Sequence, residues 1–161
     1  MAKHVQIRPQ VPWKGTILRT AVRMLIPFIQ LFGLYVIVHG HYSPGGGFQG
    51  GVILGSSIIL LALVFGIPVS RKYISAKYNA LLSVLGPIIY CGTAALCIFF
   101  GGYFLDYSAM NALLPLGKEE WRSLGIFIVE AGVGVGVMNI MISIYFSLAS
   151  AGTKEKEDRH G

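Results

Sequence analysis

The stretch MLIPFIQLFGLYVIVHGHYSPGGGFQGGVILGSSIILLALVFGI, residues 24–67, decides the fold. Two long apolar runs flank a glycine-rich segment, HGHYSPGGGFQGG, at residues 39–51. Each run approaches the roughly 20 residues that an α-helix needs to cross a bilayer. Pro44 ends any helix that reaches it, and the glycines permit backbone conformations closed to other residues. We therefore predict a hairpin of two transmembrane helices joined by a tight turn.

The same apolar pattern continues beyond this hairpin. The predicted spans are residues 16–38, 48–67, 79–104 and 124–149. The chain is 54% hydrophobic and 12% charged, whereas an ordinary soluble domain is about 25% charged. We predict an all-α integral membrane protein with four transmembrane helices. Its parts are a cytoplasmic segment at 1–15, a membrane domain at 16–149 and a solvated, frayed tail at 150–161.

The basic residues are distributed unevenly about the predicted spans. One side of the membrane carries Lys3, Arg8, Lys14, Arg19, Arg71, Lys72, Lys77, Lys154, Lys156 and Arg159. The other side carries Lys118 and Arg122, and Arg23 lies inside the first span. The positive-inside rule then places both termini in the cytoplasm. In the outward-facing segment 106–122 we expect a short interfacial helix around 118–121, with Trp121 at headgroup level.

Several function classes find no support in the sequence. The basic residues form no long tract or aromatic-interleaved patch, so we expect no nucleic-acid partner. The two cysteines, Cys91 and Cys97, are interpreted as buried apolar residues and are too few for an iron–sulfur cluster. No nucleotide loop or nucleophile–base pair is present, so we expect no enzyme activity of the chain alone, no cofactor and no metal site.

Glycines recur every four residues in two of the predicted spans. Gly47, Gly51 and Gly55 form one such series, and Gly132 and Gly136 form another. A glycine in a helix interior costs about 1 kcal/mol relative to alanine. In membranes that cost is offset where a second helix approaches the bare backbone. We predict packing faces at both stripes, either within the chain or against another subunit.

Glu130 is the only acidic residue within the four predicted spans. It lies about 9 Å inside the last span by helix rise. Such residues face a bundle interior, a cavity or a partner, because an unpaired charge in hydrocarbon costs several kcal/mol. Two interpretations remain open: a proton or Na⁺ relay, and a polar contact with a neighbouring subunit. Gln30, His41 and Asn139 can likewise line an ion path or bond across helices.

The turn between the first two spans also carries a family resemblance. GHYSPGGGFQGG resembles the MnhB/MrpB family, the small membrane subunits of Mrp-type multisubunit Na⁺/H⁺ antiporters. The matching residues are His41, Pro44, Gly45, Gly46, Gly47, Phe48, Gly50 and Gly51. The resemblance extends over about residues 16–149. It implies a multi-pass subunit in a prokaryotic cell membrane, other membrane subunits as partners, and Na⁺ and H⁺ as transported ions.

Two departures from the antiporter pattern favour the related branch found in membrane-bound hydrogenase complexes. Tyr42 and Ser43 replace the usual Asn-Ala pair, and Gln49 replaces an apolar residue. Ser123 stands where antiporter members tend to carry an acid, and they lack Glu130. The sequence thus favours a non-catalytic subunit of a cation/proton-translocating complex. An autonomous homodimeric transporter and a purely structural assembly subunit are the alternatives.

Overall fold

The computed structural model describes residues 15–40, 45–112 and 117–158, and all regular structure within them is helical. The elements are α1 (Thr16–His39), α2 (Gly47–Phe65), α3 (Ile67–Tyr73), α4 (Ala76–Phe99), the 3₁₀ helix η1 (Tyr107–Ala112) and α5 (Lys118–Asp158). By length and composition, α1, α2, α4 and α5 can each cross a membrane. The prediction of four such helices is confirmed.

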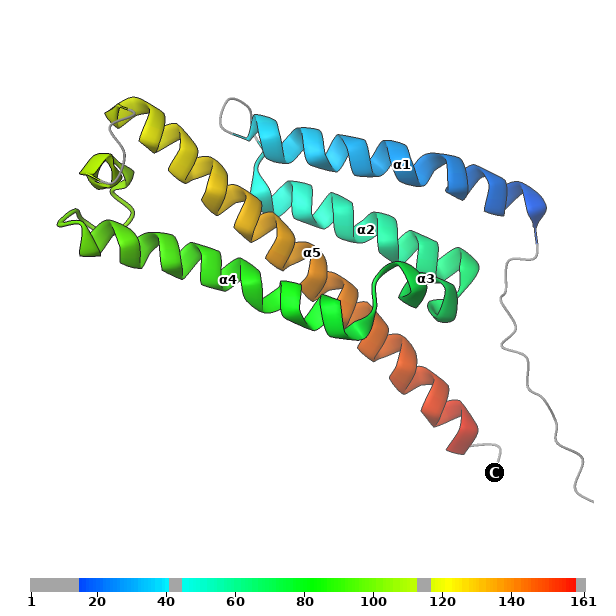
Figure 1. Cartoon of the computed structure of the whole chain (residues 1–161). Helices are drawn as coiled ribbons and strands as arrows, with labels where there is room; N and C mark the ends of the chain where they lie inside the picture. Colours follow the sequence, from blue (N-terminus) through cyan, green and yellow to red (C-terminus); the bar gives the residue numbers. More distant parts are fainter. Residues whose placement is uncertain (1–14, 41–44, 113–116, 159–161) are drawn as a thin grey trace, which may run out of the picture.

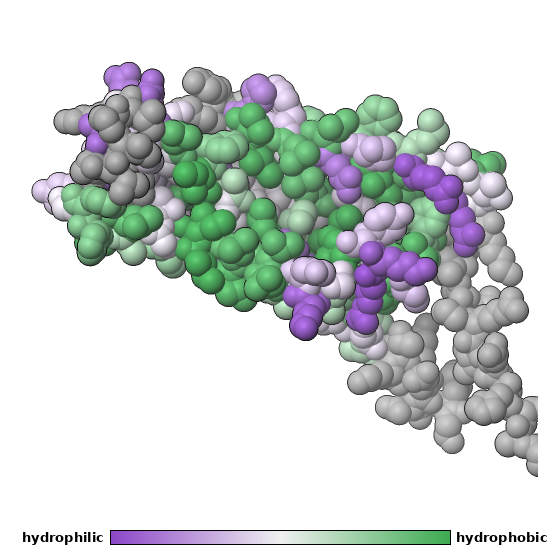
Figure 2. All heavy atoms as spheres, in the orientation of Figure 1, coloured by the Kyte–Doolittle hydropathy of each residue, from purple (hydrophilic) through white to green (hydrophobic). Residues whose placement is uncertain are grey.

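The four long helices pack as a row rather than as a closed bundle (Figure 1). The helix α2 packs against α1 on one side and α5 on the other, and α5 also packs against α4. The outer helices α1 and α4 are therefore more exposed than the two central helices. Figure 2 shows apolar side chains over the middle of the visible face and hydrophilic ones gathered toward its ends.

Glycines stand at every contact between neighbouring helices of this row. A Cβ atom at Gly51 would lie 2.5 Å from the carbonyl oxygen of Gly134, where α2 crosses α5. A Cβ atom at Gly86 of α4 would lie 2.7 Å from the Cα of Gly136 in α5. Between α1 and α2, a Cβ atom at Gly50 would lie 2.8 Å from the carbonyl oxygen of Gly33. Backbone thus meets backbone at these positions, where a larger residue would overlap the neighbouring helix.

The glycines of the two sequence stripes lie at these internal contacts. Gly55 faces the backbone of Met138, with 3.3 Å from its Cβ position to the Met138 carbonyl oxygen. A Cβ atom at Gly132 would lie 2.8 Å from the side chain of Ile89 in α4. The helix α5 therefore presents its glycines to α4 as well as to α2. Of the two kinds of packing left open by the sequence, these positions serve contacts within the chain.

The helix boundaries differ from the expected ones at three places. The second span ends at Phe65, because Gly66 adopts a φ of 91° and a separate short helix, α3, follows. The third predicted span, which is α4, ends at Phe99 rather than at 104, and Gly101 just beyond it has a φ of 80°. The last helix begins at Lys118, after Gly117 at a φ of 114°. Glycines with positive φ thus set the boundaries in each case.

Two further expectations were wrong, one on the interfacial helix and one on the tail. No separate interfacial helix forms at 118–121: these residues open α5, where Glu119 and Glu120 favour a helix N-terminus. Trp121 is buried against Cys97 and Tyr107, and its place at headgroup level stays a prediction. The tail is not frayed at 150, because α5 continues to Asp158.

The two cysteines also differ from each other. Cys97 is buried as expected, whereas Cys91 is exposed on α4. An outer helix of the row buries only one side, and Cys91 lies on the other.

Candidate functional site

Glu130 reaches from α5 to the turn that joins α1 and α2. A Cβ atom at Gly40, just after α1, would lie 2.5 Å from the Glu130 Oε1 atom. A Cβ atom at Gly46 would lie 2.6 Å from the same oxygen. A Cβ atom at Gly47 would overlap the backbone carbonyl of Glu130. The carboxyl group fits here only because all three neighbouring residues lack side chains.

The local backbone explains why this turn needs glycine. Gly46 is the N-cap of α2 and has a φ of 129°, a conformation that residues with a Cβ rarely adopt. The carboxyl group of Glu130 therefore lies beside the N-terminus of α2. The first four N–H groups of a helix have no partner within it, and that end carries a partial positive charge.

One oxygen of the Glu130 carboxyl group is available for further bonding. Oε2 is buried and has no hydrogen-bond partner among the described residues. A buried carboxylate oxygen without a partner costs free energy, and a proton, a water molecule or a cation would each remove that cost. The unpartnered atom is the Oε2 atom of Glu130, beside the N-terminus of α2.

The other predicted path residues do not join Glu130. Asn139 lies nine residues farther along α5, about 13 Å by helix rise. Gln30 lies ten residues before Gly40 on α1, about 15 Å away by the same measure. Gln30 instead lines a cavity between α1, α2 and α3. His41 and Pro44 lie outside the described residues.

The remaining turn residues divide into buried and exposed positions. Gly50 and Gly51 are buried at the contacts of α2 with its neighbours, whereas Gly45 is exposed. Phe48 is 63% exposed and is directed away from the row. Its side chain is thus available to lipid or to another subunit.

Asn139 takes part in a polar contact between α4 and α5, and the sequence predicted only one of its residues. The Nδ2 group of Asn79 donates to the Asn139 carbonyl oxygen at 3.2 Å and to the Ser143 Oγ atom at 2.5 Å. The Nδ2 group of Asn139 donates to the Val135 carbonyl oxygen at 2.7 Å. The Oδ1 atoms of both asparagines are buried acceptors without a described partner. The sequence signal for this contact was Asn79, a polar residue at the start of the third predicted span.

At the same end of the molecule as Glu130, the 3₁₀ helix η1 packs against α5. A Cβ atom at Gly125 would overlap the ring of Tyr107. Burial, with smaller contributions from Cys97 and Tyr90, raises the pKa of the Tyr107 phenol. Among the described residues, no three His, Cys, Asp or Glu side chains are grouped to hold a metal ion.

Comparisons with known proteins identify the family. Residues 17–143 match the model of a domain related to the MnhB subunit of Na⁺/H⁺ antiporters. Relatives named "Putative antiporter subunit mnhB2" occur in Staphylococcus aureus strains Newman, JH1 and Mu3. Each is 31% identical to this chain over 134 residues, which cover 83% of the chain and 93% of the relative. This four-helix chain, whose glycine turn encloses a glutamate, therefore belongs to the MnhB family of antiporter subunits.

Proposed function

We propose that this chain is a non-catalytic membrane subunit of a multisubunit complex that exchanges Na⁺ and H⁺ across a prokaryotic cell membrane. Within that complex, Glu130 takes part in ion movement. The observation that carries the proposal is the buried Oε2 atom of Glu130, without a described partner, beside the N-terminus of α2. The family match supplies the kind of complex.

The chain supplies one proton-binding group, and other subunits supply the remaining path. Glu130 is the only acidic residue in the apolar part of the four helices. Gln30 and Asn139 lie too far along their helices to continue a path from it. Among the described residues, neither of them can receive a proton from Glu130 directly. The exposed apolar faces of α1 and α4 offer the surfaces on which other subunits can pack.

Orientation is part of the proposal. Both termini lie in the cytoplasm, which puts Glu130 near the outer face of the membrane. The support is the ten-to-two distribution of basic residues. The test is labelling of Gly45→Cys and Ser75→Cys in a chain without Cys91 and Cys97. We expect the first cysteine to react from outside and the second from inside. Labelling of both from one side contradicts this orientation.

The complex belongs to the redox-driven branch of the family. Tyr42, Ser43 and Gln49 replace residues usual in antiporter members, and Glu130 is additional. The test is the identity of the subunits that co-purify with the tagged chain. Hydrogenase-type subunits with metal-cluster motifs support this branch, and antiporter subunits alone contradict it.

The role of Glu130 is tested by two substitutions in the assembled complex. Glu130→Gln keeps the shape but cannot release a proton, so ion exchange in everted vesicles should fall strongly while assembly persists. Glu130→Asp keeps the charge with a shorter reach and should retain part of the exchange. The isolated chain should show no exchange. Parental exchange by the Gln variant would limit Glu130 to a polar contact, and failure of that variant to assemble would make its role structural.

A further inference from the structure

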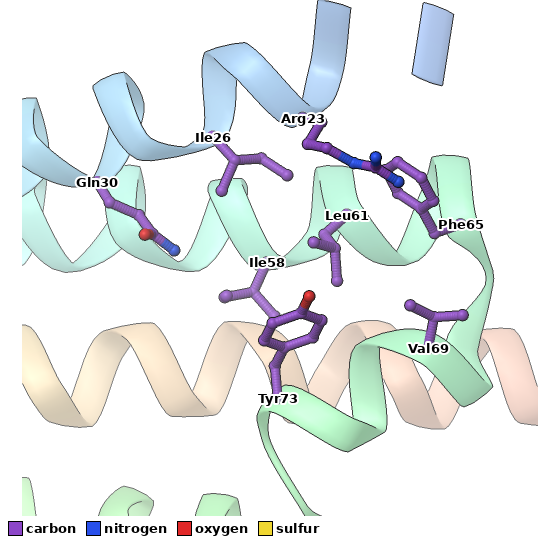
Figure 3. Close-up of a pocket in the computed structure, with 8 residues that line it drawn as sticks. All are labelled: Arg23, Ile26, Gln30, Ile58, Leu61, Phe65, Val69 and Tyr73. Atoms are coloured by element: carbon purple, nitrogen blue, oxygen red, sulfur yellow. The ribbon is translucent and has the colours of Figure 1, made fainter. Parts of the chain in front are cut away.

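A cavity of about 260 Å³ lies between α1, α2 and α3, at the end of the molecule opposite Glu130 (Figure 3). Its polar lining consists of Arg23, Gln30 and Tyr73. The rest of the lining is apolar: Ile26, Ile58, Leu61, Phe65 and Val69. Figure 3 shows the Arg23 side chain at the Phe65 end of this cavity and Gln30 at the other end.

Arg23 gives the cavity a positive charge, and α1, α2 and α3 contain no acidic residue to balance it. The Arg23 guanidinium lies over the Phe65 ring, 5.5 Å from its centroid. Residues 1–105 contain no Asp or Glu, so α1, α2 and α3 have no carboxylate to offer. Arg19 lies one turn before Arg23 on α1, and Lys72 lies on α3. Any anion at this end of the cavity must come from outside these helices.

The cavity has a charged end near the membrane boundary and an apolar length that runs inward to Gln30. Arg23 lies about 10 Å from the start of α1, and Gln30 lies about 10 Å deeper by helix rise. An arginine at such a depth extends its head toward the interface while its stem stays among apolar groups. Tyr73, which is 71% exposed, is of the aromatic type enriched at that interface.

We propose that this cavity binds an anionic phospholipid. The phosphate contacts the Arg23 guanidinium, and one acyl chain lies along Ile26, Leu61 and Phe65. Arginine binds phosphate through paired, charge-assisted hydrogen bonds, and basic pockets between transmembrane helices hold anionic headgroups. A carboxylate from a neighbouring helix would match the guanidinium but would leave the apolar length unfilled. A phospholipid has both chemical parts.

The bound lipid joins α1 to α3 across the end of α2. The helix α1 packs mainly against α2, and the cavity separates part of it from α3. An acyl chain in that space contacts all three helices. This inference does not depend on the role of Glu130, and binding in detergent does not depend on the orientation of the chain.

The test is competitive lipid binding to the purified full-length chain, measured by native mass spectrometry with equal phosphatidylglycerol and phosphatidylcholine. We expect a preference for phosphatidylglycerol. Arg23→Gln should reduce that preference about tenfold, equivalent to about 1.4 kcal/mol. Arg122→Gln, which removes an exposed arginine at the opposite end, should leave it unchanged. Equal loss in both variants, or no loss in Arg23→Gln, would overturn the proposal.

Two further measurements separate a lipid from other anions. Val69→Trp should fill the cavity from α3 and reduce binding of both lipids, and undiminished binding would contradict an acyl chain at this place. Inorganic phosphate at the same concentration should not displace the lipid, and full displacement would exclude the acyl contacts. A photo-crosslinking residue at position 69 should label phospholipid in native membranes. Labelling of a neighbouring subunit alone would assign the cavity to a protein partner.

Discussion

Glu130 and Arg23 lie at opposite ends of the molecule along the helix axes, and their surroundings differ. Glu130 is enclosed by the backbone of three glycines, and one of its oxygen atoms is buried. Arg23 lies over an aromatic ring beside a cavity of about 260 Å³. The first environment cannot adjust without moving a helix, whereas the second can. Substitutions that disturb the Glu130 end should therefore have larger effects than substitutions at the Arg23 end.

The largest effect is expected where α2 and α5 make backbone contact next to the Glu130 end. Gly51→Leu would place a side chain where the Gly134 carbonyl oxygen lies 2.5 Å from the Cβ position. Overpacking in a close-packed interior costs about 1–3 kcal/mol and occasionally more. We expect loss of complex assembly, measured by co-purification, while the chain still inserts into the membrane.

Gly92→Leu is the matched control for this substitution. Gly92 also lies in a long apolar helix, but a Cβ atom there meets nothing within 4 Å. The melting temperature of the isolated Gly92→Leu chain in detergent should match the parent, whereas that of Gly51→Leu should fall. Normal assembly and ion exchange of Gly51→Leu would show that the close approach of α2 and α5 is not required.

A smaller effect is expected at Gly46, which contacts Glu130 directly. Gly46→Ala combines an unfavourable φ of 129° with a Cβ atom 2.6 Å from the Glu130 Oε1 atom. Backbone strain of this kind costs about 1–3 kcal/mol. We expect reduced thermal stability, and also reduced ion exchange because the carboxyl group must move.

The control here is Gly101→Ala. Gly101 has a φ of 80° and open space around its Cβ position, so the substitution adds strain without disturbing Glu130. Its ion exchange per assembled complex should match the parent. If both variants lose ion exchange equally, backbone strain alone explains the loss. The contact between Gly46 and Glu130 is then not required for exchange.

The polar contact midway along α5 should be less sensitive than either glycine. Asn79→Ala removes the donor to the Asn139 carbonyl oxygen and the Ser143 hydroxyl. Hydrogen bonds between membrane helices contribute about 0.6–2 kcal/mol, so the melting temperature should fall modestly. Ser83→Ala is the control, because its hydroxyl donates only to the Asn79 carbonyl oxygen within α4. An equal change in both variants would contradict a stabilising contact between α4 and α5.

Local sequence patterns predicted the helices but not the way they are arranged. Apolar run length is a property of each segment, so the four spans followed directly from the sequence. The row order requires knowing which glycine faces which partner, and the spacing of Gly51 and Gly132 is compatible with contacts inside or outside the chain. The burial of Trp121 escaped prediction for the same reason, since it depends on Cys97 and Tyr107 from distant segments.

The candidate site was predicted in part. The isolation of Glu130 in an apolar run was visible in the sequence, because burial of a lone charge is costly whatever the fold. Its contact with Gly40, Gly46 and Gly47 was not visible, since it depends on how α5 crosses the α1–α2 turn. The cavity at Arg23 was likewise hidden, because α3 was not expected and supplies two of its walls, Val69 and Tyr73.

The smallest effect is expected at the Arg23 end, where the guanidinium lies over the Phe65 ring at 5.5 Å. A cation–π contact contributes about 0.5–1 kcal/mol at exposed sites. Phe65→Leu keeps an apolar wall for the cavity and removes the aromatic face, together with part of the packing of Phe65 against Val22, Ile26 and Val64. Its melting temperature should therefore fall slightly, and Phe28→Leu, at a ring 67% exposed on α1, should change it less. A double-mutant cycle with Arg23→Gln isolates the contact, because the two single changes should together cost more than the double change. Additive costs would show that Arg23 gains nothing from the ring. Phosphatidylglycerol binding should persist in Phe65→Leu but not in Arg23→Gln, since the phosphate contact needs the guanidinium and not the aromatic face.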